Sequence, residues 1–250
     1  MKCIAMIPAR MGSSRFPGKP LALLRGRPMI EHIYHRVRMC GLLTETFIAT
    51  CDEEILNAAA AFGARAIMTG AHHERATDRI AEAMTGIDAD IVVMVQGDEP
   101  MVVPEMIDAA LRPYRTGGSV PACVNLAKRI DDEAEFRSPN TIKVVIDRND
   151  DALFMTRVPI PTLAPGGFAE TRTLKQVCIM PFTRQALADF AALDPTPLEK
   201  LESIDMLRFL EHGRKVRMVE TPYDSQAVDT PADLALVESL MQQDPLCARY

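Results

Sequence analysis

Residues 3–20 read CIAMIPARMGSSRFPGKP, from Cys3 to Pro20. The apolar run 3–7 has the length of a buried strand, and the segment after it holds two glycines, two serines, two arginines and one lysine. Backbone N–H groups and cations in a loop that follows a buried strand can surround a polyphosphate. The stretch therefore predicts a strand that leads into a phosphate-binding loop.

The spacing in this loop differs from that of two familiar phosphate-binding motifs. Five residues separate Gly12 from Gly18, where a Walker A loop has four, and Pro20 stands where that loop places its Mg²⁺-binding hydroxyl. The G-x-G-x-x-G spacing of dinucleotide-binding folds is also missing. The alternative interpretation is a turn whose charged side chains are simply solvated.

Apolar runs and segments with helical periodicity alternate along the first half of the chain. This alternation implies βαβ units and a parallel sheet, which binds its ligands at the carboxyl ends of the strands. We expect an α/β fold with a mostly parallel central sheet flanked by helices, in a single domain over residues 1–250. The predicted strand and helix pairs are 3–7 with 29–39, 46–50 with 55–62, 66–68 with 80–84, and 91–95 with 106–111.

The pattern changes after Pro121. The apolar runs 142–146, 153–155 and 177–180 are separated by turn residues instead of full helices, which predicts antiparallel strands. The Pro- and Gly-rich stretch 159–167 predicts a loop, either a mobile arm over a site or an inert excursion. Near the end we expect a helix over 197–210, a strand over 215–219 and a last helix over 231–241, capped by the preceding residues.

Two aspartates are candidate metal ligands. Asp98 follows the apolar run 91–95, so it would lie at the carboxyl end of a strand and face the phosphate-binding loop. Mg²⁺ is commonly held by one or two carboxylates together with substrate phosphates. Asp229 would complete such a pair only if the fold brings it beside Asp98. The alternative for each aspartate is a capping or turn residue.

Two arginines are candidates for binding an acidic substrate. Arg79 falls in the first turn of a predicted helix, where a cation opposes the helix dipole and a functional demand for it is conceivable. Arg157 precedes the Pro-rich loop. Each guanidinium would either grip a carboxylate through two hydrogen bonds or be an ordinary surface charge.

Composition excludes several classes of protein. The chain has 250 residues and a net charge of −6, and its 28 Lys and Arg residues are scattered, which argues against a nucleic-acid surface. No segment approaches the roughly 18 apolar residues of a membrane span. The six cysteines show neither C-x-x-C spacing nor a metal-ligand pattern with the five histidines, so we expect mostly buried, reduced thiols and a cytoplasmic location.

Seven blocks, in their order and separations, resemble the CMP-Kdo synthetases, the 3-deoxy-manno-octulosonate (Kdo) cytidylyltransferases of bacterial lipopolysaccharide synthesis. The resemblance runs through nearly the whole chain. The blocks are 7–20, Gly26-Arg27-Pro28-Met29-Ile30, Thr77-Asp78-Arg79, Gln96-Gly97-Asp98-Glu99-Pro100, Asp151-Ala152-Leu153-Phe154, Arg157 with Pro159-Ile160-Pro161, and Val228-Asp229-Thr230-Pro231.

This resemblance implies a nucleotide-diphospho-sugar-transferase-like, Rossmann-like fold with a small antiparallel dimerisation lobe. It also implies a homodimer that uses Mg²⁺ to transfer CMP from CTP to an acidic sugar and releases pyrophosphate. By analogy, the residues that bind CTP are Arg10, Ser13, Arg15 and Lys19 at the triphosphate and Pro8 and Ala9 at the base. The metal ligands are Asp98 and Asp229, and the catalytic residues are these two together with Arg10 and Lys19. The residues that face the sugar are Arg79, Gln96, Arg157, Gln176 and Asp205.

The departures from the family pattern that would face the sugar fall in two blocks. The chain has Lys175-Gln176-Val177-Cys178-Ile179-Met180 where the family usually has Lys-His-Val-Gly-Ile-Tyr. It has Glu202-Ser203-Ile204-Asp205-Met206-Leu207-Arg208 where the family usually has Glu-Ser-Leu-Glu-Gln-Leu-Arg. A buried polar contact is worth roughly 1–3 kcal/mol, so these changes can shift substrate choice. The acceptor stays open between Kdo and another acid, such as a nonulosonic acid or a phosphonate.

Two other classes of function share part of this pattern. A non-catalytic binder of nucleotides or sugar acids would not need a catalytic metal pair, so the presence of both Asp98 and Asp229 argues against it. A uridylyl- or guanylyltransferase acting on a sugar phosphate would share the loop after the first strand.

Overall fold

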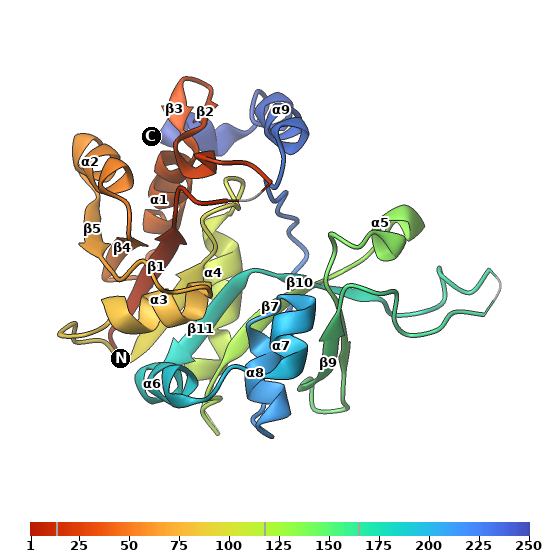
Figure 1. Ribbon diagram of the computed structural model, residues 1–250. Helices are drawn as coiled ribbons and strands as arrows, with labels where there is room; N and C mark the ends of the chain where they lie inside the picture. The colour runs from red at the N-terminus through yellow and green to blue at the C-terminus, as the bar shows by residue number, and fades with distance from the viewer. Residues whose placement is uncertain (14, 118, 165) are drawn as a thin grey trace. The chain divides into compact units, whose positions relative to one another are not determined.

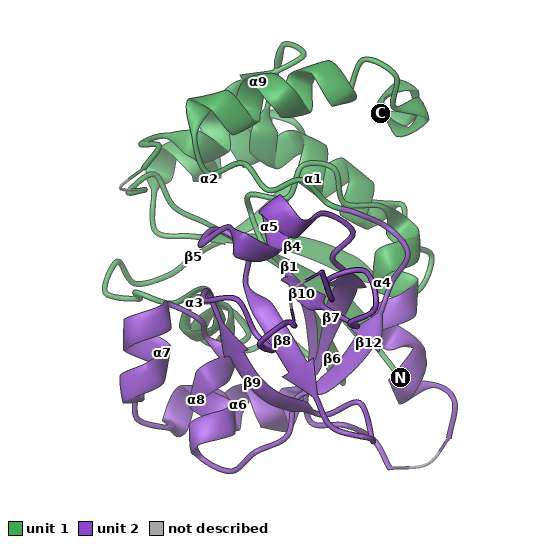
Figure 2. Ribbon diagram, turned by 90° about the vertical axis from the view of Figure 1, so that its right-hand side faces the viewer, with its two compact units in different colours: residues 1–108, 225–250 green, residues 109–224 purple. Residues whose placement is uncertain are grey.

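The computed structural model describes residues 1–13, 15–117, 119–164 and 166–250. These residues form two compact units: Met1–Asp108 together with Ser225–Tyr250, and Ala109–Asp224 (Figure 2). The single domain expected over residues 1–250 stays a prediction. Ser14 of the predicted phosphate-binding loop and Pro165 of the predicted 159–167 loop lie outside the described residues.

The first unit is built around a parallel sheet. Strand β1 (Cys3–Ala9) pairs with β4 (Glu45–Thr50) on one side and with β6 (Ile91–Val95) on the other. Strand β5 (Arg65–Met68) extends the sheet beyond β4, also in parallel (Figure 1). Every residue of β1 and β6 is buried, as expected for strands covered on both faces. The parallel sheet predicted from the sequence is confirmed.

Helices surround this sheet much as predicted. Helices α1 (Met29–Arg38), α2 (Glu53–Ala61) and α3 (Ala76–Ala83) pack against its strands. Within the described part of the chain, no helix combines the length and the apolar character needed to cross a membrane. The remaining elements associated with this unit are η1 (Lys19–Leu21), β2 (Leu23–Leu24), β3 (Arg27–Pro28), α9 (Pro231–Leu240) and η3 (Pro245–Arg249), and α4 (Pro104–Leu111) leads out of it.

The start of α9 is fixed by a reciprocal capping box. The Thr230 hydroxyl accepts a hydrogen bond from the Asp233 N–H at 3.3 Å, and Asp233 Oδ2 accepts one from the Thr230 N–H at 2.8 Å. The Asp229 N–H also donates to Asp233 Oδ2, at 3.1 Å. Because Asp233 and Thr230 cap the helix, the Asp229 carboxylate is not used as a cap, which answers the alternative raised by the sequence.

The second unit contains a mixed, mainly antiparallel sheet in the order β12-β7-β10-β8-β9. Strand β10 runs antiparallel to β7 and β8, β8 runs antiparallel to β9, and β12 runs parallel to β7. The antiparallel strands predicted after Pro121 are thus confirmed, whereas a role of this sheet in dimerisation stays a prediction. The elements are η2 (Arg112–Tyr114), β7 (Val124–Arg129), α5 (Glu133–Arg137), β8 (Lys143–Ile146), β9 (Ala152–Thr156), β10 (Leu174–Val177), β11 (Ile179–Thr183), α6 (Arg184–Ala192), α7 (Pro197–Glu202), α8 (Met206–Glu211) and β12 (Arg217–Glu220).

Two predicted elements of this unit are wrong in their boundaries. The predicted strand 177–180 is divided between the end of β10 and the start of β11. The predicted helix 197–210 is two helices, because Ser203 adopts a left-handed backbone with φ 56° and ends α7. A buried pair then joins the two helices: Arg208 Nε and Nη2 donate to the two carboxylate oxygens of Glu199 at 2.8 and 2.7 Å.

Candidate active site

The loop after β1 is closed on itself and anchored at its base. The Gly18 N–H donates to the Met11 carbonyl at 3.0 Å, and the Met11 N–H donates to Asp52 Oδ2 at 2.8 Å. Gly18 has φ 74°, a left-handed conformation that glycine adopts at little cost, and it places Lys19 at the start of η1. The local sequence therefore gives Lys19 a defined position.

Lys19 joins three segments that are far apart in the sequence. Its ammonium Nζ donates to Asp98 Oδ2 at 3.0 Å and to the Val228 carbonyl at 2.8 Å, and it lies 3.5 Å from Asp229 Oδ1. The Lys19 side chain is only 12% exposed, so water screens these interactions weakly. The fold thus brings Asp98 and Asp229 to the same cation. The sequence analysis required this proximity for the two residues to act as a carboxylate pair.

Further contacts of the first unit reinforce this cluster. Arg15 Nη2 lies 2.9 Å from Asp229 Oδ1, and the Val228 N–H donates to the Asp98 carbonyl at 2.9 Å. Two cations therefore face two carboxylates, and a backbone hydrogen bond holds the segments that carry the carboxylates together. We name Arg15, Lys19, Asp98 and Asp229 the charged cluster.

Gly97 allows the segment that carries Asp98 to approach β1. A Cβ atom added at Gly97 would lie 2.4 Å from the carbonyl oxygen of Pro8, a distance that real Cβ atoms do not show. The end of β6 can reach the end of β1 only because this residue has no side chain. The glycine is visible in the sequence motif Gln96-Gly97-Asp98, but its contact with the Pro8 carbonyl can be seen only in the structure.

The other predicted nucleotide-binding residues lie along the same part of the first unit. Pro8 and Ala9 are buried at the carboxyl end of β1, and Arg10, the next residue, is exposed. The Ser13 hydroxyl accepts a hydrogen bond from the Phe16 N–H at 3.3 Å and so shapes the loop. Gln96, which was predicted to face the sugar acid, follows β6, is half-buried, and lies two residues before Asp98.

Arg79 is a buried residue of α3 and holds the loop between β5 and α3. Its Nη1 donates to the Thr69 hydroxyl at 2.6 Å and to the Gly70 carbonyl at 3.3 Å, and its Nη2 donates to the His73 carbonyl at 3.4 Å. Only 3% of the residue is exposed. The surface-charge interpretation of Arg79 is therefore wrong.

In the second unit, Arg157 is held by Glu202. The Arg157 N–H donates to Glu202 Oε2 at 2.9 Å, and its Nε donates to the Glu202 carbonyl at 2.8 Å. Its own carbonyl accepts a hydrogen bond from the ammonium of the fully buried Lys143 at 2.5 Å. Burial lowers the pKa of Lys143, and the positive charge of Arg157 lowers it further. Arg157 is half-buried and fixed in place on both sides.

Gln176 of β10 is positioned by a residue that the sequence analysis missed. Gln176 Nε2 donates to Asn125 Oδ1 at 2.5 Å, and the buried Asn125 amide donates to the Leu126 and Val177 carbonyls, both at 2.8 Å. The only sequence feature that pointed to Asn125 is that it is an amide side chain among the apolar residues at the start of β7. Asp205, the remaining residue predicted to face the sugar, is half-buried at the N-cap position of α8.

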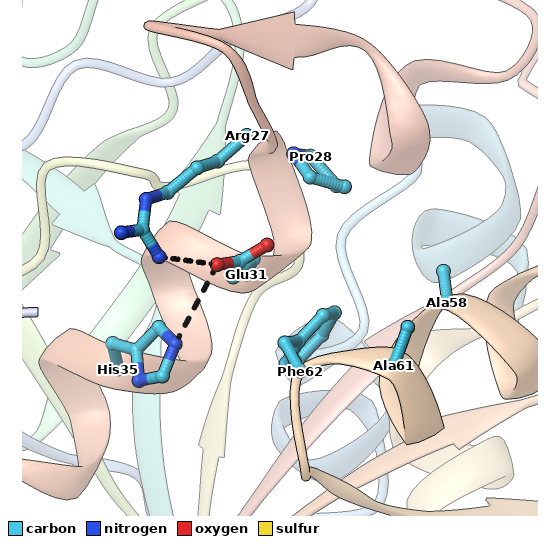
Figure 3. Close-up of a pocket in the computed structure, with 7 residues that line it drawn as sticks. All are labelled: Arg27, Pro28, Glu31, His35, Ala58, Ala61 and Phe62. Atoms are coloured by element: carbon cyan, nitrogen blue, oxygen red, sulfur yellow. Dashed lines mark hydrogen bonds and ion pairs between the residues drawn. The ribbon is translucent and has the colours of Figure 1, made fainter.

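A pocket of about 500 Å³ lies elsewhere in the first unit, between α1 and α2 (Figure 3). Glu31 accepts a hydrogen bond from Arg27 Nη1 at 2.5 Å and lies 3.7 Å from His35 Nε2. Burial lowers the pKa of His35. No residue predicted for the nucleotide or the sugar lines this pocket, which is formed by Arg27, Pro28, Glu31, His35, Ala58, Ala61 and Phe62.

The charged cluster has the chemistry of a site for a phosphorylated ligand. The cations Arg15 and Lys19 can neutralise phosphate oxygens, and the carboxylates of Asp98 and Asp229 can hold a hard divalent ion. A family model described as cytidylyltransferase matches residues 4–217. The chain belongs to the cytidylyltransferase family.

Individual cytidylyltransferases match along nearly their whole length. The 3-deoxy-manno-octulosonate cytidylyltransferase of Geobacter metallireducens is 46% identical, over 96% of this chain and 98% of its own. The protein of the same name from Syntrophus aciditrophicus is 44% identical, over 96% of this chain and 97% of its own. A structure of CMP:2-keto-3-deoxy-manno-octonic acid synthetase complexed with CTP superposes with a TM-score of 0.89 at 39% identity, covering 97% of this chain and 99% of that one.

A more distant structure matches in fold alone. The 4-diphosphocytidyl-2C-methyl-D-erythritol synthase of Anaerococcus prevotii has a TM-score of 0.62 and 16% sequence identity, over 97% of this chain and 99% of its own. The α/β architecture is thus retained where most of the sequence has changed.

Gly97→Ala tests the close approach of β6 to β1. The added methyl group overlaps the Pro8 carbonyl and forces the strand ends apart, so we expect the free energy of unfolding to fall by about 1–3 kcal/mol in urea denaturation. Gly41→Ala is the matched control, because a Cβ there meets nothing within 4 Å. Equal stability of the two variants would contradict the close approach.

Proposed function

We propose that the protein transfers CMP from CTP to Kdo and releases pyrophosphate. The main support for this proposal is the charged cluster, in which Arg15 and Lys19 from the segment after β1 contact Asp98 and Asp229. The chain also belongs to the cytidylyltransferase family. The choice of CTP and Kdo is supported by the names of the relatives that match over nearly the whole chain.

In this proposal the loop after β1 holds the triphosphate. Lys19 and Arg15 neutralise phosphate charge, Arg10 and Ser13 add contacts from the same loop, and Pro8 and Ala9 border the base. A phosphoryl-type transfer is accelerated mainly by positioning and by stabilising the charge of the transition state. The closed, anchored loop suits that task because Arg15 and Lys19 already have defined positions.

We further propose that Mg²⁺ is the cofactor and that Asp98 and Asp229 hold it. The two carboxylates fit this ion, because both supply hard oxygen ligands and both already face one cation, Lys19 Nζ. When bound, Mg²⁺ would neutralise phosphate charge and lower the pKa of the attacking hydroxyl. No side-chain base is then required.

The acceptor's anomeric hydroxyl attacks the α-phosphorus of CTP in line, and the bond from that phosphorus to the bridging oxygen of pyrophosphate breaks. The hydroxyl proton leaves to solvent. We assign Arg79, Gln96, Arg157, Gln176 and Asp205 to the sugar acid. Since Gln176 Nε2 donates a hydrogen bond to Asn125 Oδ1, we propose that Gln176 Oε1 accepts one from a substrate hydroxyl.

We also propose that the enzyme is a homodimer and works in the cytoplasm, in line with the family resemblance. The elution volume of the purified protein in size-exclusion chromatography tests the dimer, and a volume corresponding to one chain would overturn it.

Pyrophosphate release tests the proposed reaction. With CTP and Mg²⁺, we expect turnover of Kdo and much slower turnover of nonulosonic acids and small phosphonates, because one mismatched buried polar contact costs roughly 1–3 kcal/mol. Replacing CTP by UTP or GTP should abolish most of the signal. Turnover of another acid alone would reassign the acceptor, and silence with every acid would favour a non-catalytic binder.

Asp98→Asn tests the role of the carboxylate pair. The substitution keeps the size of the side chain but removes its charge, so we expect pyrophosphate release to fall by about 10²-fold or more while the circular dichroism spectrum stays unchanged. Asp88→Asn, at an exposed position of the same unit, is the matched control and should keep its activity. Near-normal turnover by Asp98→Asn would remove Asp98 from the metal site.

A further inference from the structure

A second group of metal-ligating side chains lies between the loop that precedes α3 and the last turn of α3. The imidazoles of His72 and His73 and the carboxylate of Glu82 each offer a ligand atom, and these atoms all lie within 4.8 Å of one another. The two rings have centroids 4.1 Å apart. None of the three residues is assigned to the nucleotide, the sugar acid or Mg²⁺, so the proposed reaction does not explain why they converge.

Glu82 holds the loop that carries the histidines. Its two carboxylate oxygens accept hydrogen bonds from the Gly70 N–H at 3.1 and 3.0 Å, and Oε2 also contacts His73 Nε2. Arg79 binds the same loop through the carbonyls of Gly70 and His73. Contacts from both Glu82 and Arg79 therefore order the loop in the absence of any ion.

Gly70 makes room for the second imidazole. A Cβ atom at this position would lie 2.4 Å from His72 Cε1 and 2.5 Å from His72 Nδ1. The His72 ring can lie across the loop, close to Glu82, only because residue 70 has no side chain. His72 and Glu82 are exposed and His73 is half-buried, so an ion and its water ligands can reach the group.

The donor set selects for one class of ion. Two imidazole nitrogens and one carboxylate oxygen suit Zn²⁺, Co²⁺, Ni²⁺ and Cu²⁺, whereas Mg²⁺ prefers oxygen ligands alone. The Gly70 N–H holds the Glu82 carboxylate in place beside the two imidazoles. The pair Asp98 and Asp229 offers only carboxylate oxygens, which suit Mg²⁺, so the two sites differ in the metal that they prefer.

We propose that His72, His73 and Glu82 bind one divalent transition-metal ion of the Zn²⁺ class, with water in the remaining coordination positions. The ion replaces the contact between His73 and Glu82 and joins the loop to α3 through three ligands. Because Arg79 donates to carbonyls of the same loop, the bound ion also restricts the movement of Arg79.

Titration of the full chain, purified without a histidine tag, tests this site. Co²⁺ serves as the spectroscopic probe and Zn²⁺ as its competitor. We expect one saturable site that Zn²⁺ displaces, with affinity reduced by about tenfold or more in His72→Ala and in Glu82→Gln. His212→Ala, at another exposed histidine, and Asp98→Asn should both keep the site. His72→Ala should keep its turnover with Mg²⁺, since His72 lies outside the proposed reaction.

Three outcomes would overturn the proposal. One is the absence of saturable Co²⁺ binding by the unaltered chain. Another is unchanged binding in both His72→Ala and Glu82→Gln, which would place the ion elsewhere. The third is a thiolate charge-transfer band on Co²⁺ binding, which would assign the ion to cysteines. None of these outcomes bears on pyrophosphate release with Mg²⁺, so the proposed function is tested separately.

Discussion

The ion pairs of Lys19 are the interaction on which the site depends. Its ammonium binds Asp98, after β6, and the Val228 carbonyl, and it lies beside Asp229, ahead of α9. Two half-buried carboxylates drawn together would repel each other unless cations faced them. Lys19 and Arg15 supply those cations. The position of Lys19 and the pairing of the two aspartates therefore depend on each other.

Backbone constraints deliver these charges to one place. The left-handed Gly18 sets the start of η1, the bare Gly97 lets the end of β6 reach the Pro8 carbonyl, and the capping box of α9 uses Asp233 so that the Asp229 carboxylate is left for Lys19. Gly18 and the capping box act within a few residues, whereas Gly97 acts between two strands. Together they position four charged side chains from three distant parts of the sequence.

Much of this arrangement could be predicted from the sequence because periodicity and motif order record it directly. The parallel strands and the loop after β1 follow from such patterns, whereas the pairing of Asp98 with Asp229 was implied only by the family resemblance. Other features depend on tertiary contacts that no local pattern encodes. Asn125 gains its importance from Gln176 on a neighbouring strand, and the break between α7 and α8 depends on the left-handed Ser203.

The most direct test of this account is the rate of pyrophosphate release by Lys19→Met with CTP, Mg²⁺ and Kdo. Because the variant leaves the two aspartates without their shared cation and removes the cation that we propose for the phosphates, we predict a loss of about 10²-fold or more, with Lys2→Met unaffected. A rate within about twofold of the unaltered enzyme would show that the site does not depend on the ion pairs of Lys19.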